Sequence, residues 1–196
     1  MWSLKAGDNM QIKGPFVKLA YEPNKWSSVG MVAGGTGIAP MYQLILEMLA
    51  NPRDRTEIRL IYASRTEADI ILKTELDALA IVYPNFKVRH NVTIPFTDST
   101  TLTHITATPL LAPAQVQYVL SKPGEGWGGA TGHIKKESIT SFLPSPQEGP
   151  STKIFVCGPP GFMNTLSGSK KSPTDQGELT GLLKDLKYSS EQVFKF

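Results

Sequence analysis

The sequence has few of the residues that build disulfides and metal sites, and it has no long apolar run. Cys157 is the only cysteine among 196 residues, so no disulfide can form within the chain and a reducing compartment is allowed. His90, His104 and His133 are scattered, with neither cysteines nor paired carboxylates beside them, so we expect no metal site. No segment approaches the length of a transmembrane helix, and no signal peptide opens the chain.

The sequence also has little net charge, formally +3 at pH 7. This small excess gives no strong electrostatic case for binding nucleic acid or an acidic membrane surface. The composition, 40% hydrophobic and 19% charged, is that of a globular protein. The length suits one large domain, or one domain plus a fragment of another.

A glycine-rich stretch, residues 29–40, is the feature around which the rest is organised. Its first residues, 29–33, are apolar and predict a buried strand, and the glycines that follow predict a turn. Pro40 suits the first position of a helix, where its missing N–H would have no helical partner. The next apolar residues recur every three or four positions, as on one helix face: Met41, Leu44, Ile45, Met48 and Leu49.

Such a turn exposes backbone N–H groups at the positive end of a helix, which favours phosphate or pyrophosphate binding. Glycine can also serve turn geometry alone, so both interpretations stay open at this point.

Further apolar runs predict strands at residues 57–63, 86–88, 116–120, 153–157 and 192–196. Helical patterns lie between them, one of which Asp69 could cap. Alternating strands and helices predict an α/β fold, an open parallel sheet of about five strands with helices on both faces.

Residues 88–115 interrupt this pattern, because they are rich in threonine and proline and have no helical or strand period. Structureless segments of this length are uncommon within compact domains. The segment is a functional insert, a disordered insert or an error in the sequence, and a real insert would be a mobile loop beside the sheet edge. Deleting it joins 86–87 to 116–120 as one strand. We hypothesise a translated intron, which retention of these codons in mature message would refute.

Two glycine turns after separate strands, residues 34–40 and 157–163, together closely resemble those of the ferredoxin reductase-like flavoproteins. More narrowly, the chain resembles the NADH-cytochrome b5 reductases. Residues 62–72 match the second strand and helix of that family, and the tail at 172–179 and 193–196 looks like its fungal mitochondrial branch. The resemblance covers almost everything except the segment 88–115.

The resemblance implies an enzyme that transfers a hydride from NADH to FAD, whose electrons then pass singly to cytochrome b5. It also implies a monomer that belongs to a membrane-anchored parent protein. The expected location is mitochondrial, in the outer membrane or intermembrane space. The alternative location is the cytosolic face of the endoplasmic reticulum membrane.

The resemblance assigns the first turn to the cofactor pyrophosphate, through the backbone of Gly34, Gly35 and Gly37, with Thr36 contacting phosphate and Pro40 opening the helix. The turn lacks the G-x-G-x-x-G spacing of the ordinary dinucleotide fingerprint.

Tyr62, Ala63 and Asp69 would also bind cofactor, with the Asp69 carboxylate near the adenosine ribose, where it repels a 2′-phosphate and favours NADH. Ser64 and Arg65 argue the other way, because such a pair could hold a 2′-phosphate.

The resemblance makes Cys157 the catalytic candidate, a thiol that packs by the nicotinamide and helps position it without acting as a nucleophile. A buried structural cysteine is the alternative. The other expected cofactor-binding residues of this turn are Gly158, Pro159, Pro160, Phe162 and Met163, the last two of which could instead be plain core. Trp127 and Gly132 match the family's loop that faces the cofactor cleft. Phe196 could lie near the flavin or pack within its strand.

The chain departs from the family at its start, because the Arg-x-Tyr-Ser/Thr motif of the flavin site does not occur in it. We therefore expect residues 1–27 to be the remnant of an FAD-binding barrel and residues 28–196 to be the NAD-binding domain. We also expect this chain not to retain FAD. The alternatives are a catalytically inactive NAD-binding fragment, or the reductase module of a related flavoprotein such as nitrate reductase.

Overall fold

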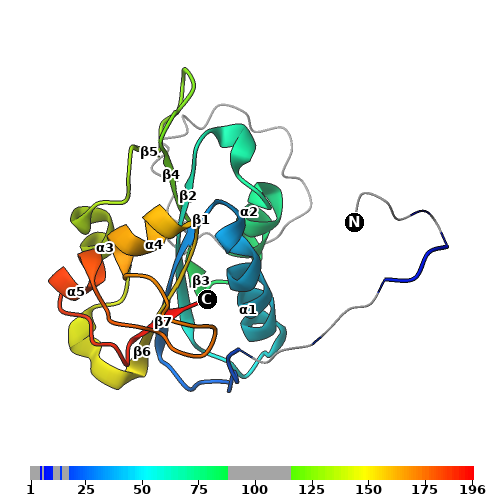
Figure 1. Cartoon of the computed structure of the whole chain (residues 1–196). Coiled ribbons are helices and arrows are strands. Elements are labelled where there is room, and N and C mark those ends of the chain that lie inside the picture. The colour runs from blue at the N-terminus through cyan, green and yellow to red at the C-terminus, as the bar shows by residue number, and fades with distance from the viewer. Residues whose placement is uncertain (1–4, 6, 11–13, 15–17, 88–115) are drawn as a thin grey trace.

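A computed structural model describes residues 5, 7–10, 14, 18–87 and 116–196 of the chain (Figure 1). Within them, seven strands form one sheet in the order β5-β4-β2-β1-β6-β7, and β3 also pairs with β2. Every strand pair is parallel. The strands are β1 Ser28–Gly34, β2 Glu57–Ser64, β3 Phe86–Lys87, β4 Gln117–Leu120, β5 Ala130–Thr131, β6 Thr152–Cys157 and β7 Val193–Lys195.

The helices lie on both faces of this sheet, α1 and α2 on one side and α3, α4 and α5 on the other (Figure 1). Their bounds are α1 Ile38–Ala50, α2 Lys73–Val82, α3 Lys136–Phe142, α4 Pro160–Leu166 and α5 Gly181–Asp185, with short 3-10 turns η1 Gly35–Gly37, η2 Glu67–Asp69 and η3 Pro146–Ser151. The predicted parallel α/β fold with helices on both faces is confirmed.

The central strands are buried on both faces, so two cores form. Side chains alternate along a strand, and on β1 Met31 joins the core beneath α1 whereas Val32 joins the core beneath α3 to α5. On β6, Phe155 and Val156 divide in the same way. This double burial explains the nearly continuous apolar runs from which the strands were predicted.

The structure differs from the prediction in its strand count and in one helix. The sheet has seven strands rather than about five, because β5 has no apolar pattern and because residues 86–87 and 117–120 form separate segments, β3 and β4. Helix α4 was missed, since the sequence Gly-Pro-Pro-Gly at 158–161 was interpreted only as a turn. Proline suits the first turn of a helix, and α4 begins at Pro160.

The first two helices also begin differently from the prediction. Helix α1 starts at Ile38, so Pro40 is its third residue rather than its first. Asp69 does not cap α2, which begins at Lys73 after Leu72 with a φ of 60°. Asp69 instead closes η2, which precedes that helix.

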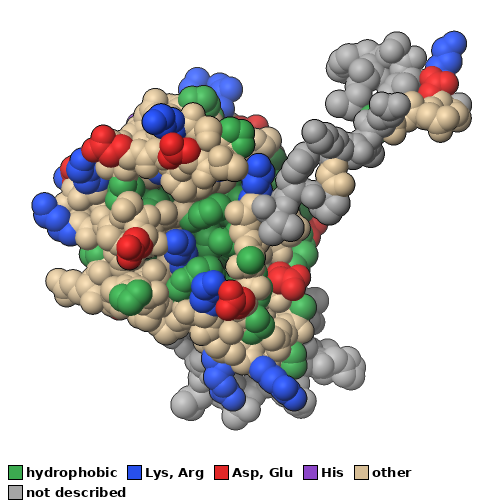
Figure 2. Space-filling view, turned by 60° about the horizontal axis from the view of Figure 1, so that its bottom comes forward, with side chains coloured by type: hydrophobic (Ala, Val, Ile, Leu, Met, Phe, Trp, Pro, Cys, Tyr) green, Lys and Arg blue, Asp and Glu red, His purple; other side chains and the backbone are tan. Residues whose placement is uncertain are grey.

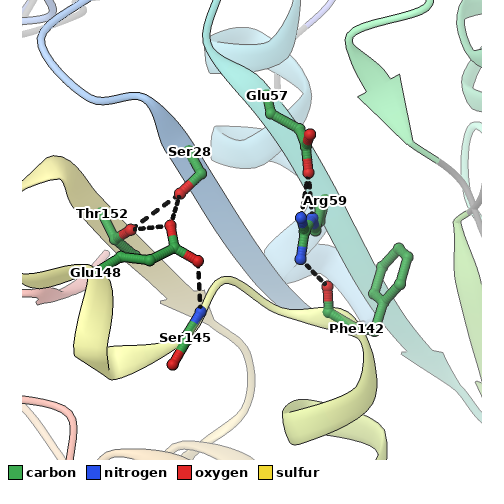
Figure 3. A network of polar contacts seen from close by, with 7 residues as sticks. All are labelled: Ser28, Glu57, Arg59, Phe142, Ser145, Glu148 and Thr152. Carbon is green, nitrogen blue, oxygen red and sulfur yellow. Dashed lines mark hydrogen bonds and ion pairs between the residues drawn. The ribbon is translucent and has the colours of Figure 1, made fainter.

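A polar network joins the amino ends of the strands, at the edge opposite the glycine turns (Figure 3). The Glu148 carboxylate accepts hydrogen bonds from Ser28 Oγ at 2.7 Å, Thr152 Oγ1 at 2.9 Å and the Ser145 N–H at 3.0 Å. Ser28 and Thr152 are the first residues of β1 and β6. One carboxylate thus holds the starts of two central strands together.

Arg59 extends the same region toward α3. It pairs with Glu57 on its own strand and donates to the Phe142 carbonyl at 3.0 Å (Figure 3). The arginine thereby fixes the end of α3 against β2.

Two predictions fall on residues outside those that the structure describes. The segment 88–115, with its hypothesised origin, lies wholly outside them, and the expected barrel remnant, residues 1–27, lies partly outside them. Among the described helices, none has the length and apolar character needed to cross a membrane.

Candidate functional site

The carboxyl ends of three central strands bring the two predicted turns together. The register pairs Ala33 of β1 with Tyr62 of β2 on one side and with Cys157 of β6 on the other. Open parallel sheets bind ligands at this edge, in the crevice beyond the strand ends. The turn after β1 and the turn after β6 therefore face one common region.

The first turn leaves its backbone accessible. Gly35 has a φ of +54°, which disfavours any side chain, and a Cβ built on it would meet nothing within 4 Å. The Thr36 side chain is exposed. No side chain caps the start of α1 and no acidic residue lies in its first turn. These features fit a pyrophosphate, which needs N–H donors, open space and no competing carboxylate.

The two turns pack backbone to backbone. A Cβ on Gly37 would lie 2.2 Å from the Cys157 carbonyl oxygen and 2.8 Å from the Gly158 nitrogen. Because backbone atoms cannot swing aside as a side-chain end can, glycine is required at position 37. The resemblance assigned this glycine to approach of the pyrophosphate, which stays a prediction; what the structure shows is that Gly37 meets the second turn.

Phe162, on α4, closes the space between the same turns. A Cβ on Gly34 would lie 3.1 Å from the Phe162 ring, and one on Gly158 would lie 2.4 Å from it. Met163 beside it is buried in the core beneath α3 to α5. Phe162 is thus packed as a wall of the turn region, whereas Met163 is a core residue.

Cys157 is half-buried at the end of β6. Burial raises the pKa of its thiol, an effect that the nearby Lys170 ammonium and the Gly158 backbone partly oppose. The thiol is therefore protonated at neutral pH, which agrees with a packing role and not with a nucleophile. The Lys170 Nζ lies 5.8 Å from the centre of the Phe194 ring, and its positive charge also acts on the Cys157 thiol.

Asp69 lies exposed in the loop after β2. Its carboxylate accepts from the Thr66 hydroxyl at 2.7 Å and from the Thr66 N–H at 3.0 Å, as in a capping box. These two hydrogen bonds lower the pKa of Asp69, and Arg65 adds to the effect. The carboxylate is therefore ionised at neutral pH and lies exposed at the surface. Of the pair that could hold a 2′-phosphate, Arg65 is exposed but Ser64 is buried.

Tyr62 is fully buried at the end of β2, so its predicted cofactor contact would have to be indirect. Its hydroxyl donates to the Gly35 carbonyl at 3.0 Å and accepts from the Ile71 N–H at 3.3 Å. Burial raises the pKa of Tyr62, which keeps the donated proton in place. The side chain thus connects the glycine turn with the loop that contains Asp69.

An aromatic cluster packs along β6 and β7. Phe196 packs 5.7 Å from Phe155 and 5.1 Å from Phe194, measured between ring centres. Its N–H donates to the Val156 carbonyl, which is ordinary strand packing. Figure 2, which brings the lower end of Figure 1 forward, shows hydrophobic side chains in a hollow near the middle of the view, with Lys and Arg side chains beside it.

The remaining predicted residues differ in exposure. Pro159 and Pro160 are exposed at the second turn, and Pro40 and Ala63 are partly exposed. Trp127 folds back in its own loop, where its indole N–H donates to the Ala130 carbonyl at 3.2 Å.

Sequence reasoning missed Lys170 as a neighbour of Cys157, because a loop lysine thirteen positions away has no pattern that would place it there. Within the described residues, no group of three or more metal-ligating side chains occurs.

Comparisons with known proteins agree with this geometry. The family model described as the oxidoreductase NAD-binding domain matches residues 31–106 and 108–167. NADH-cytochrome b5 reductase 2 of Debaryomyces hansenii is 44% identical over 193 residues, which are 98% of this chain and 55% of that protein. The protein of that name from Aspergillus niger is 42% identical over 194 residues, 99% of this chain and 52% of that protein. The chain thus spans about half the length of these relatives.

Solved structures give the same fold. The cytochrome b5 reductase domain of Ulva prolifera nitrate reductase superposes with a TM-score of 0.69 at 28% identity, over all of this chain and 63% of that one. The CS-b5R domains of human Ncb5or superpose with a TM-score of 0.60 at 22% identity, over 94% of this chain and 40% of that one.

Proposed function

Because this chain belongs to the oxidoreductase NAD-binding domain family, we propose that it is the NADH-binding part of a reductase that supplies electrons to cytochrome b5. The observation that carries the proposal is the packing of the two glycine turns at one sheet edge. Relatives more than 40% identical are named for that activity.

In this proposal the residues of the chain bind and orient the dinucleotide. The backbone from Gly34 to Gly37 receives the pyrophosphate at the start of α1, helped by the exposed Thr36 hydroxyl. Asp69 meets the adenosine ribose and disfavours a 2′-phosphate by charge repulsion. Cys157 positions the nicotinamide through packing, because its thiol is half-buried and protonated. NADH supplies the hydride and FAD accepts it when both are bound.

We further propose that residues 28–196 are the NAD-binding domain and that residues 1–27 belong to the flavin-binding domain of a longer protein. Figure 2 shows hydrophobic side chains in a hollow of the surface, and exposed apolar surface of this kind is commonly covered by a partner domain. In the longer protein, FAD would bind mainly outside this chain. For the longer protein, we propose a monomeric, membrane-anchored mitochondrial reductase. The support is the resemblance of residues 172–179 and 193–196 to the fungal mitochondrial branch of the family.

An absorbance spectrum tests whether this chain retains FAD and reduces it with NADH, as well as binding NADH. Purified chain is mixed with FAD, desalted, and reduced anaerobically with NADH. We expect no retained flavin band while NADH still binds in a separate titration, because the flavin-site motif does not occur in the chain. A flavin band that survives desalting and bleaches with NADH would contradict that expectation and would show a working site in this chain alone.

A second candidate is the reductase module of a nitrate reductase, favoured by the structural likeness to the Ulva prolifera domain. Measuring which electron acceptor the full-length protein prefers would distinguish a cytochrome b5 reductase from a nitrate reductase module.

A further inference from the structure

Tyr62 lies between the two loops that the proposed function assigns to the cofactor, the glycine turn and the loop that contains Asp69. Its ring is buried beneath α1 and α2, so the side chain is fixed by packing. Only its hydroxyl reaches out of the core, to Gly35 on one side and to Ile71 on the other. These partners are separated by the whole of α1 and β2 in the sequence, and Tyr62 is the side chain that joins them.

The Gly35 carbonyl accepts from Tyr62 and also from the Ile38 N–H at the end of η1, and its orientation determines where the next N–H points. In a trans peptide the carbonyl and the following N–H point in opposite directions. With the Gly35 carbonyl drawn toward Tyr62, the Thr36 N–H is directed away from the core. The space around Gly35 is open, because a Cβ built there would meet nothing within 4 Å. The same reasoning applies to Ile71, whose N–H is drawn inward two residues after Asp69.

We propose that Tyr62 is a positioning residue that sets the glycine turn and the Asp69 loop at the spacing that NADH requires. This inference rests on the proposed function, because it assumes that the dinucleotide spans both loops. Tyr62 would act through Gly35 and Ile71 and would not itself touch the ligand.

Tyr62→Phe is the direct test, because it keeps the buried ring and removes both hydrogen bonds. Tyr118→Phe is the matched control. Tyr118 is the neighbour of Tyr62, 6.2 Å away between ring centres, but its hydroxyl donates to Asp77 on α2. Both variants lose one buried phenol hydroxyl from the same core, and only the first disconnects the two loops.

Binding of NADH and of adenosine is measured by titration, together with the thermal unfolding midpoint. Adenosine has no phosphate and so probes the ribose end alone. We expect Tyr62→Phe to weaken NADH about three- to tenfold, to weaken adenosine less, and to change the unfolding midpoint no more than Tyr118→Phe does. The Gly35 carbonyl would keep its hydrogen bond from the Ile38 N–H, and Ile71 is exposed to water.

Two results would overturn the role of Tyr62. One is unchanged NADH affinity in Tyr62→Phe, and the other is an equal loss in both variants, which would indicate a general effect of core stability. If the unaltered chain bound no NADH, the proposed function would fail and this inference with it, so the two failures are distinguishable.

The pairing of β2 gives an independent argument for the single strand that the sequence analysis obtained by deleting residues 88–115. Its residues Ile58 and Arg59 pair with Phe86 and Lys87 of β3, and pairing resumes at Ile61 with Gln117 of β4. One position of β2, Leu60, lies between the two segments. A single residue opposite Leu60 would join β3 and β4 into one continuous strand. The chain instead has residues 88–116 between Lys87 and Gln117.

Val116, directly before β4, has the character that this position needs. It is fully buried in the core beneath α1 and α2. That core also contains Phe86, Tyr118 and Leu120. If Lys87 were followed directly by Val116, these side chains would alternate across the sheet as one strand requires.

We infer that β3 and β4 are two parts of one strand and that residues 88–115 are an insertion into it. The chain without these residues should form the same sheet. This conclusion depends only on the register of the described residues on either side.

Three deletions test the register. Deletion of 88–115 should give a folded protein with an unfolding midpoint at or above that of the full chain, because closing a long loop costs entropy. Deletion of 88–116 or of 88–114 shifts the following residues by one, which sends Tyr118 and Leu120 to the opposite face. Both should have clearly lower midpoints. An unfolded 88–115 deletion, or three deletions of equal stability, would overturn the inference.

Discussion

Gly37 and Cys157 approach so closely that a Cβ on Gly37 would lie 2.2 Å from the Cys157 carbonyl oxygen. These residues belong to turns on different strands, and their contact fixes the distance between the proposed pyrophosphate and nicotinamide ends of the site. The functional geometry therefore depends on a backbone contact as well as on side chains.

Gly37→Ala should destabilise the protein and weaken NADH binding together. The new methyl group meets a backbone oxygen, so one turn must shift, at a cost of about 1–3 kcal/mol in the free energy of unfolding. Denaturant unfolding and an NADH titration measure the two effects. Gly124→Ala is the control, since a Cβ there would meet nothing within 4 Å. Equal stability of the two variants would contradict the contact.

The Cys157 thiol should react slowly with iodoacetamide at pH 7.5. Burial raises its pKa, and only the thiolate reacts. The pH at which the rate is half-maximal should lie above about 8.5, the value for a free cysteine. Lys170→Met should move it higher still, because the lysine charge favours the thiolate. As the chain has one cysteine, alkylation reports on this site alone. A midpoint that falls in Lys170→Met would refute the assigned proximity.

Asp69→Asn should reduce the preference for NADH over NADPH by about three- to tenfold, because it removes a charge that repels the 2′-phosphate. Asparagine keeps one oxygen to accept from Thr66, so the loop should hold its shape. Glu67→Gln removes the same charge from the same 3-10 turn and is the control. If both variants changed the preference equally, net charge and not the position of Asp69 would be responsible.

Glu148 should make stability depend on pH. Burial opposes its ionisation, but the hydrogen bonds from Ser28, Thr152 and the Ser145 N–H outweigh this and lower the pKa of Glu148. A carboxyl with a lowered pKa stabilises the fold above its unfolded-state pKa, and this contribution disappears as pH falls through the folded-state value.

Glu148→Gln should therefore cost about 0.5–1 kcal/mol at pH 7, a modest amount because the side chain is exposed and water screens it. The difference in free energy of unfolding between the two proteins should narrow as the pH is lowered from 5 to 3. Urea unfolding at several pH values measures it. A gap that widened in acid would contradict the network of Figure 3.

The central strands and the two turns could be predicted from sequence because their signals are local. The apolar run of β1, the glycines after it and the periodic residues of α1 lie within one continuous stretch, and β6 with its glycine turn repeats the arrangement. Parallel pairing then brings the two turns to one edge.

Features that depend on distant contacts could not be read in this way. The tyrosine at position 62 looks like any aromatic strand residue, and only the fold places its hydroxyl between Gly35 and Ile71. Lys170 is a loop residue whose position beside Cys157 follows from how the loop after α4 returns. Strand β5 has two residues and no apolar alternation, so no periodicity could indicate it.

The most direct test of the account is calorimetric titration of the folded chain with NADH and, separately, with NADPH. We expect saturable binding of one NADH per chain, with NADPH weaker, because the glycine turn would accept the pyrophosphate and Asp69 would repel the 2′-phosphate. No saturable NADH binding by a chain that unfolds cooperatively would contradict it, since the two turns would then pack together without forming a dinucleotide site.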